Sequence, residues 1–236
     1  MHIAYAPDIC SDSYDLSEEE SKHCLKVLRM VKGDALMLLD GKGTVYSAEV
    51  VYDRLPVCKL RITSKHFIER SKDAYVHIAI AVLRQPDRLE WFVEKATEIG
   101  ADEISLLLCE RCEKQHISMR RIEKILISAL KQSGRPWLPV FNAPKTFKDF
   151  IEQEHEKNKY IAHCMYEEKE ELLLISRTTQ GASLIVIGPE GDFSRNEIQM
   201  ALSRHFIPVS IGPTRLRSET AGVVACALLC VAGKNK

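Results

Sequence analysis

Residues 183–202, SLIVIGPEGDFSRNEIQMAL, join an apolar run to a polar run through a turn that contains two glycines. The apolar run at 183–187 predicts a buried strand. Ser194 and Glu197 have the spacing of a capping box, which predicts that a helix begins just after Ser194. The stretch is therefore a strand–turn–helix unit, which is typical of α/β domains with a mainly parallel sheet.

The turn at 188–192 is a candidate ligand site, because its backbone N–H groups lie at the positive end of the following helix. It carries Glu190 and Asp192 and no basic residue before Arg195, so an anionic ligand would meet two like charges. The glycine spacings of P-loops and dinucleotide motifs and the ligand spacing of an EF-hand are all absent. A neutral or cationic ligand with hydroxyl groups fits better. The simpler alternative is a turn whose glycines only relieve strain.

Residues 210–222, SIGPTRLRSETAG, form a second strand–glycine–helix junction. Two such junctions could face one ligand. Arg215, Arg217 and Glu219 stand at the start of an almost wholly apolar helix. Charged groups beside buried surface indicate either a specific partner or a salt bridge at the helix start, and the pattern leaves both open.

The chain after residue 70 repeats this alternation of strands and helices. Its patterns predict strands at VHIAIAVL (76–83), EISLLL (103–108), KYIAHCM (159–165) and FIPVSI (206–211). Helices are predicted from Asp87, as the cap, to Gly100, and over residues 118–132 and 219–232. We therefore expect one α/β domain over residues 71–236.

The first 70 residues have a different, β-rich pattern. Ser17 and Glu20 have capping-box spacing and predict a helix from Glu18 to about Arg29. The turn DGKG at 40–43 lies between two β-rich runs and predicts a hairpin, and residues 57–69 predict a third strand. Residues 1–70 are therefore expected to form a small separate domain.

Charge and composition exclude several classes of protein. Basic and acidic residues balance at 33 each, so any nucleic-acid binding must depend on a local patch. The N-terminus lacks the pattern of a secretory signal, and the longest apolar run, 221–233, is too short to span a bilayer. Eight cysteines at irregular spacings fit reduced cytosolic thiols better than disulfides. We expect a soluble cytoplasmic protein with no membrane partner.

Two local clusters allow competing interpretations. Residues 111–135 hold seven basic and two acidic side chains, a net charge of +5, and form either a solvated helix face or a surface for an RNA backbone. A second, weaker basic surface includes His23 and Arg29. Cys109, Cys112 and His116 could suggest zinc, but no second ligand pair follows at a suitable spacing, so we expect no metal.

Six motifs in order resemble the RsmE-type methyltransferases of the SPOUT superfamily. They are HCLKVLRMVKGD (23–34), DGKG (40–43), EKATEIGADEI (94–104), QSGRPWLP (132–139), IGPEGDFSRNEI (187–198) and LRSETA (216–221). The family methylates N3 of a uridine in small-subunit (16S) ribosomal RNA. The resemblance implies an N-terminal PUA-like β-barrel that helps to hold RNA, followed by a SPOUT-type α/β domain with a C-terminal trefoil knot, in a homodimer.

The resemblance also implies that S-adenosylmethionine binds between the two glycine loops. The cofactor contacts carried over by motif are His163, Gly188, Glu190, Gly191, Ile211, Gly212, Leu216, Arg217 and Thr220. Two features depart from the family pattern. Asp192 stands where the family usually has a third glycine, and the chain opens Met-His-Ile-Ala-Tyr where the family often has arginines.

The implied reaction needs an attacking N3 atom held in line with the methyl carbon, and it needs no metal. The uridine N3 must lose its proton, which a carboxylate could accept, while a cation could stabilise the negative charge on the ring oxygens. Glu219 and Arg217 are the candidates for these two roles, and His23, Arg29, Gln132 and Arg135 for binding the RNA substrate in the 30S subunit. The alternatives are a non-catalytic RNA-binding or ribosome-assembly module and, less well supported because the dinucleotide spacing is absent, a nucleotide-dependent oxidoreductase.

Overall fold

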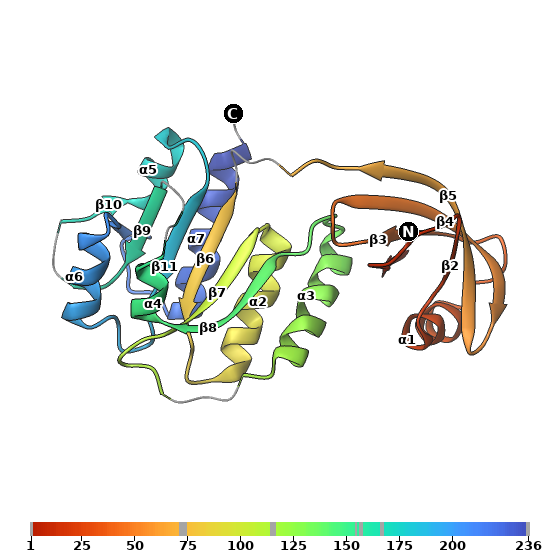
Figure 1. Ribbon diagram of the computed structural model, residues 1–236, viewed down its shortest axis with the longest axis horizontal. Coiled ribbons are helices and arrows are strands. Elements are labelled where there is room, and N and C mark those ends of the chain that lie inside the picture. The colour runs from red at the N-terminus through yellow and green to blue at the C-terminus, as the bar shows by residue number, and fades with distance from the viewer. Residues whose placement is uncertain are drawn as a thin grey trace. The chain divides into compact units, whose positions relative to one another are not determined.

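The computed structural model describes residues 2–70, 75–113, 117–153, 155, 158–165 and 168–234. For residues 233 and 234 only the backbone is described. The chain forms two compact units (Figure 1). The first contains Met1–Arg70 together with Ile127–Leu138, and the second contains Ser71–Leu126 together with Pro139–Lys236. Among the helices described, none is long and apolar enough to cross a membrane.

The first unit is built on a five-stranded sheet of order β1-β3-β4-β5-β2. The strands are β1 (His2–Tyr5), β2 (Ser13–Asp15), β3 (Ala35–Leu39), β4 (Thr44–Arg54) and β5 (Val57–Phe67). All neighbours are antiparallel except β1 and β3. The predicted hairpin and third strand are confirmed as β3, β4 and β5. In the described part of the chain no pairing of β1 with β2 closes the sheet into a barrel.

The predicted helix from Glu18 to about Arg29 is confirmed as a helical segment, but only its first half is α-helical. Ser17 caps α1 (Glu18–Lys22) as expected, since its Oγ accepts a hydrogen bond from the backbone N–H of Glu20. At His23 the chain widens into a π-helical turn, η1 (His23–Val27). The segment then ends at Arg29, whose φ of 56° is the left-handed conformation that commonly stops a helix. The sequence carries no signal for the wider turn.

Residues 127–138 group with the first unit because the turn at residues 40–43 bonds to them directly. The backbone N–H of Gly43 donates to the carbonyl of Pro136 at 3.0 Å, and that of Leu138 donates to the carbonyl of Gly41 at 2.9 Å. The indole N–H of Trp137 also donates to the carbonyl of Ile68 at 2.8 Å. A boundary set at residue 70 by pattern alone places this segment with the second unit.

The second unit contains a seven-stranded sheet of order β10-β12-β9-β11-β6-β7-β8. Its strands are β6 (Val76–Ala81), β7 (Glu103–Leu108), β8 (Val140–Thr146), β9 (Asn158–Ala162), β10 (Glu170–Glu171), β11 (Ser183–Ile187) and β12 (Ile207–Ser210). Every pair of neighbours is parallel, which confirms the predicted α/β class. All residues of β6 and β11 are buried, as expected for strands covered on both faces.

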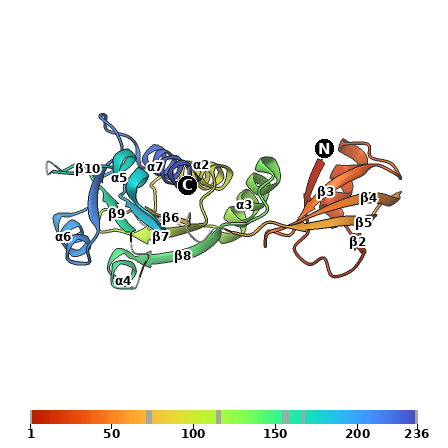
Figure 2. The ribbon, with the colours of Figure 1, turned by 90° about the horizontal axis from the view of Figure 1, so that it is seen from above.

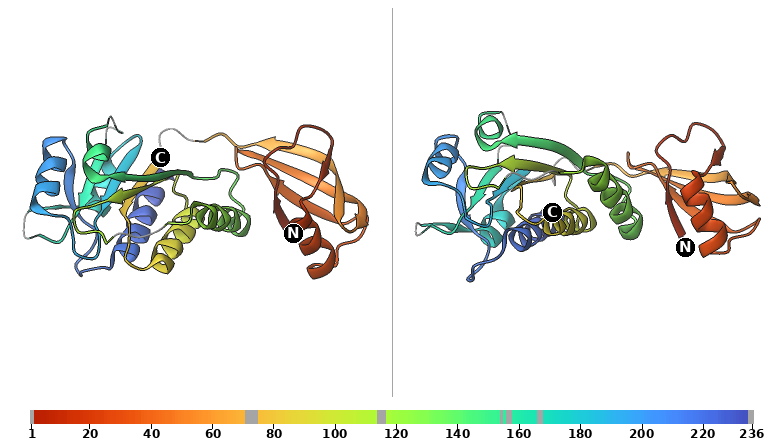
Figure 3. Two further views of the ribbon diagram at one scale, coloured as in Figure 1. Left: turned by 60° about the horizontal axis from the view of Figure 1, so that its bottom comes forward. Right: turned by 90° about the horizontal axis from the view of Figure 1, so that it is seen from below.

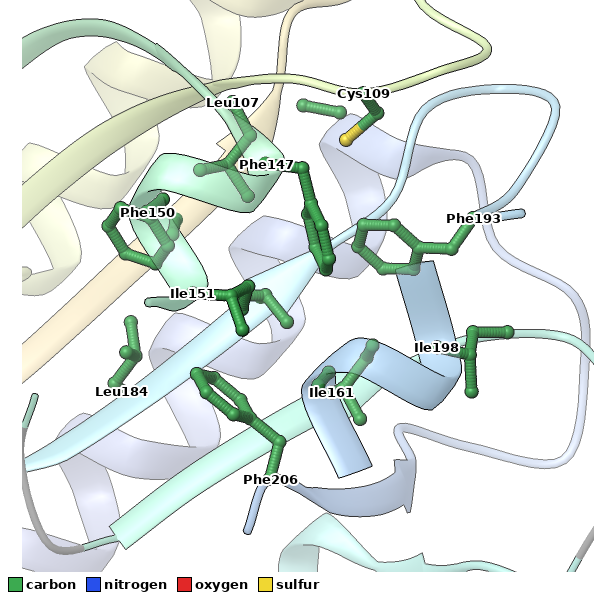
Figure 4. Close-up of a cluster of buried hydrophobic side chains, with 14 residues drawn as sticks. Leu107, Cys109, Phe147, Phe150, Ile151, Ile161, Leu184, Phe193, Ile198 and Phe206 are labelled. Carbon is green, nitrogen blue, oxygen red and sulfur yellow. The ribbon is translucent and has the colours of Figure 1, made fainter. Parts of the chain in front are cut away.

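Helices cover both faces of this sheet. They are α2 (Pro86–Ile99), α3 (Met119–Ser133), α4 (Phe147–Ile151), α5 (Leu172–Thr178), α6 (Arg195–Ser203) and α7 (Ser218–Lys234). Figures 2 and 3 show α2, α5 and α7 on one face and α4 and α6 on the other. The α4–α6 face packs through a buried aromatic cluster that includes Phe147, Phe150, Phe193 and Phe206 (Figure 4).

Helix α2 corrects one predicted cap. Pro86 occupies the first helical position after Gln85, so Asp87 lies inside the first turn and is not the cap. The predicted end is confirmed, because Gly100 adopts a φ of 128° that residues with a Cβ rarely adopt. Strand β8 carries no alternating pattern and contains Pro144, which fits its place at the edge of the sheet.

Helices α2 and α7 approach each other at Gly222. A Cβ atom on Gly222 would lie 2.6 Å from Cε2 and 2.8 Å from Cδ2 of Phe92. The ring of Phe92 is fully buried and has no room to withdraw. The glycine therefore permits the contact between these two helices.

Gly222→Ala should lower the free energy of unfolding by about 2–3 kcal/mol, as overpacking of a core does. The sign of the change is informative, because alanine is favoured over glycine inside a helix by about 1 kcal/mol and would stabilise α7 if space were available. Urea denaturation followed by circular dichroism measures the change. Phe92→Leu in the same chain should recover part of the loss. A Gly222→Ala protein as stable as the wild type would show that the helices do not meet there.

Candidate functional site

A cavity of about 680 Å³ lies in the second unit at the carboxyl ends of β9, β11 and β12. Both glycine loops line it, 188–192 after β11 and 211–217 after β12, together with the loop after β9. Ligands of open α/β sheets commonly bind at the carboxyl ends of the strands. The two junctions seen in the sequence thus face one space.

Most residues expected to contact a cofactor line this cavity. They are His163, Gly188, Glu190, Ile211, Gly212, Leu216 and Arg217. Among the described residues, Gly191 and Thr220 do not line the cavity, but a direct neighbour of each does. The backbone of the two glycine loops and the end of β9 therefore enclose the site.

Three consecutive residues of the first loop are fastened to three different strand-exit loops. The carboxylate of Glu190 accepts a hydrogen bond of 3.1 Å from the backbone N–H of Arg84, after β6. The carbonyl of Gly191 accepts one of 2.7 Å from the guanidinium of Arg111, after β7. The carboxylate of Asp192 accepts one of 2.8 Å from the backbone N–H of Cys164, after β9. The loop is therefore tied to the loops that follow β6, β7 and β9.

Asp192 has a left-handed backbone, with a φ of 64°. This conformation suits glycine, and aspartate is one of the few other residues that adopt it readily. Its backbone N–H donates to the carbonyl of Pro189 at 2.9 Å, and its second carboxylate oxygen accepts from the backbone N–H of Phe193 at 2.8 Å. The loop thus keeps the conformation expected of a glycine while it carries a side chain.

The predicted capping box at the start of α6 is confirmed. Ser194 and Glu197 exchange both hydrogen bonds, at 3.2 Å and 2.8 Å. The other oxygen of the Glu197 carboxylate accepts a 2.8 Å bond from the backbone N–H of Glu110, after β7. Glu197, which caps α6, therefore also joins the start of this helix to the loop after β7.

The two residues expected to perform catalysis lie in different surroundings. Arg217 is exposed and lines the cavity. Glu219 is only 6% exposed and lies 3.7 Å from the guanidinium of Arg88 on α2. Its Oε2 atom is buried and has no hydrogen-bond partner among the residues the structure describes. Glu219 does not line the cavity, although Ser218 and Ala221 do.

The four residues expected to bind RNA all belong to the first unit. His23 begins η1, with its ring 5.1 Å from that of His2, and Arg29 follows η1 on the surface. Burial, followed by the nearby His23, lowers the pKa of His2. Gln132 and Arg135 lie at the end of α3 and just beyond it. A salt bridge between Lys131 and Glu20 joins this end of α3 to α1.

The structure divides the basic run at 111–135. Arg111 holds the first glycine loop, Arg121 pairs with Glu90 at 2.7 Å, and Lys131 pairs with Glu20. Arg120 and Lys124 are exposed on α3, and Lys114 lies outside the described residues. Several of these cations thus support the protein itself, so the run is not one free basic face.

Cys109 and Cys112 form a tight turn, with the backbone N–H of Cys112 donating to the carbonyl of Cys109 at 3.0 Å. A hydrogen bond from the Cys109 thiol lowers the pKa of Cys112. Where the chain is described, no group of three or more metal-ligating side chains is present, and His116 lies outside that part.

Sequence reasoning missed part of the cavity wall. Lys169 and Cys164 line it from the loop after β9, and the ammonium of Lys169 donates to the carbonyl of His163 at 2.6 Å. No motif identifies them. The rule that ligands bind at the carboxyl ends of parallel strands is the signal that could have found this loop.

Comparison with known proteins agrees with this architecture. A family model described as an RNA methyltransferase domain matches residues 70–230, and one described as an RNA methyltransferase PUA domain matches residues 16–54. A solved structure of a probable rRNA-methyltransferase from Porphyromonas gingivalis is 36% identical, with a TM-score of 0.86 over 96% of this chain and 95% of that chain. These findings place the protein in the class of RNA methyltransferases that carry a PUA domain.

More specific relatives share one name. Ribosomal RNA small subunit methyltransferase E of Synechocystis sp. is 29% identical over 95% of this chain and 75% of its own length. The same enzyme of Neisseria gonorrhoeae, solved bound to S-adenosyl methionine, is 26% identical, with a TM-score of 0.83 over 96% of this chain and 95% of that chain. The chain belongs to the ribosomal RNA small subunit methyltransferase E (RsmE) family.

Proposed function

We propose that this protein transfers a methyl group from S-adenosylmethionine to N3 of one uridine in small-subunit (16S) ribosomal RNA. The observation that carries the proposal is the cavity enclosed by the two glycine loops at the edge of a parallel sheet. Family membership and the cofactor bound to the Neisseria gonorrhoeae enzyme support it.

The residues of the cavity fit this cofactor. Glu190 and Asp192 make the first loop acidic, which disfavours a phosphate and is compatible with a sulfonium that carries ribose hydroxyls. A Cβ atom added to Gly212 would meet nothing within 4 Å, so backbone at this point borders open space. Gly188, Ile211, Gly212 and Leu216 would hold the adenosine through the loop backbones, with His163, Glu190, Gly191, Arg217 and Thr220 completing the contacts. The cofactor supplies an electrophilic methyl group when bound.

The chain's own contribution to the chemistry is to place the uracil ring and manage its charge. Loss of the N3 proton puts negative charge on the two ring oxygens, which Arg217 at the cavity wall would stabilise. Glu219 is the proposed proton acceptor, placed behind the cavity wall between the lining residues Ser218 and Ala221. Its buried Oε2 atom lacks a hydrogen-bond donor in the described part of the protein, and such an unsatisfied acceptor calls for an explanation, of which a catalytic role is one.

The first unit is proposed to hold the RNA. Residues 1–70 would act as a PUA-like RNA-binding domain, with His23, Arg29, Gln132 and Arg135 contacting the substrate, and residues 71–236 as the SPOUT methyltransferase domain. We propose the assembled 30S subunit as the substrate and the cytoplasm as the location. The return of α7 onto β6 and β11, after the chain has passed through β12, supports a trefoil knot at the C-terminus.

A homodimer is proposed through α5 and α7. Leu173 and Leu174 on α5 and Val231 on α7 are apolar and 40%, 57% and 60% exposed. These helices pack against each other, so the exposed side chains extend an apolar surface that a second copy would cover. Sedimentation equilibrium tests this part of the proposal, and a monomer at micromolar concentration would contradict it.

Mapping modified uridines by mass spectrometry in a strain that lacks the gene tests the function. One N3-methyluridine should disappear from 16S RNA and return with the wild-type gene. The second candidate is a non-catalytic RNA-binding or ribosome-assembly module that retains the fold. In that case the modification pattern would not change when the gene is removed.

A further inference from the structure

The carboxylate of Asp192 joins two walls of the cavity. It belongs to the loop after β11, and it accepts the 2.8 Å hydrogen bond from the backbone N–H of Cys164, which follows β9. Asp192 and Cys164 both line the cavity, as does His163 between Cys164 and the end of β9. Within the loop after β9, the ammonium of Lys169 donates a hydrogen bond to the carbonyl of His163.

A glycine at this position would keep the turn but lose the connection. The left-handed φ of 64° is the conformation that a glycine would supply at no steric cost. Only a side chain can reach the backbone N–H of Cys164. A carboxylate is well suited, because one oxygen accepts from Phe193 and holds the side chain in place while the other accepts from Cys164.

We propose that Asp192 is a positioning residue that fixes the loop after β9, with His163 and Cys164, against the first glycine loop, and thereby shapes the cavity for the cofactor before it binds. This inference rests on the proposed function, since the ligand is taken to be S-adenosylmethionine. Asp192 acts through Cys164 and the loop backbone, and it does not take part in the transfer of the methyl group.

Asp192→Gly isolates this role, because it removes the carboxylate and glycine adopts the left-handed backbone conformation without strain. The dissociation constant for S-adenosylmethionine, measured by titration calorimetry, should rise about tenfold, as expected when a charge-assisted hydrogen bond that preorganises a site is lost. The turnover number at saturating cofactor should change less than about threefold, because the transition state gains nothing directly from Asp192. Asp192→Asn keeps a tolerated backbone and one acceptor, and should restore part of the affinity.

Amide hydrogen exchange provides a readout that needs no cofactor. The Cys164 amide should exchange slowly in the wild type and at least about tenfold faster in Asp192→Gly. Asp149→Asn is the matched control, since Asp149 is an exposed aspartate on α4 that does not line the cavity, and it should alter neither quantity. If Asp192→Gly fails to fold, Asp192→Asn and the Cys164 amide carry the test.

The outcomes separate this inference from the proposed function. Wild-type protein that neither binds S-adenosylmethionine nor methylates RNA would overturn the proposed function. Wild-type protein that binds it, with Asp192→Gly equal in affinity and in Cys164 exchange, would overturn the positioning role alone. An equal loss of turnover and affinity that asparagine does not restore would also overturn it.

Discussion

Arg217→Ala should reduce methyl transfer to small-subunit RNA about 100- to 1000-fold, while the dissociation constant for S-adenosylmethionine changes only a few-fold. The loss follows from removing a cation that stabilises charge on the uracil oxygens, a contribution of this size for oxyanion-type donors. Cofactor affinity should persist because the adenosine is proposed to be held mainly by the loop backbones, which the substitution leaves in place. Arg217 lines the cavity and is exposed, so among the residues the structure describes its removal leaves no buried partner unpaired.

Single-turnover transfer from labelled S-adenosylmethionine and titration calorimetry together measure the two quantities. Arg204→Ala is the matched control, because Arg204 is an exposed arginine at the end of α6 outside the cavity lining. It should match the wild type in both assays. Undiminished turnover in Arg217→Ala would remove Arg217 from the mechanism.

Glu219→Gln should reduce methyl transfer about 100-fold or more at neutral pH, the range lost with a general base. The change preserves the shape of a buried side chain that is 6% exposed, so the fold should survive. The rate of the variant should rise as pH increases, because solvent then removes the N3 proton that Glu219 no longer accepts. The wild-type rate should depend less steeply on pH over the same range.

Arg88→Met tests whether Glu219 acts as a base or only as a structural anchor. Glu219 lies 3.7 Å from the guanidinium of Arg88, so its alternative role is to fasten the start of α7 to α2. If Glu219 is the base, Arg88→Met should lose less than about tenfold in rate, because the carboxylate remains. Equal losses in Glu219→Gln and Arg88→Met, with no rise in rate at high pH, would assign Glu219 to positioning.

The features that the sequence predicted correctly depend on local signals. The strand–turn–helix unit at 183–202 follows from an apolar run, two glycines and a capping box, and the structure contains β11, the loop and α6 in that order. The second junction before α7 is equally local. Because the carboxyl ends of parallel strands lie at one edge of the sheet, two such junctions could be expected to face one ligand.

The features that the sequence did not predict depend on contacts between distant residues. Nothing in the pattern links Asp192 to Cys164, or residues 127–138 to the turn at 40–43, because each hydrogen bond joins residues far apart in the chain. The π-helical turn at His23 and the edge strand β8 were also not predicted, because neither has a periodic pattern in the sequence. Glu219 and Arg217 are two positions apart, yet burial against α2 separates their surroundings.

Transfer of a labelled methyl group by the purified protein to 30S subunits that lack the modification tests the central claim most directly. The subunits are digested after the reaction, and the labelled nucleoside is identified by mass spectrometry. We predict one N3-methyluridine per 16S RNA with wild-type protein and almost none with Arg217→Ala. Protein that binds S-adenosylmethionine but transfers no methyl group to any ribosomal RNA, or that labels another atom or base, would contradict the account.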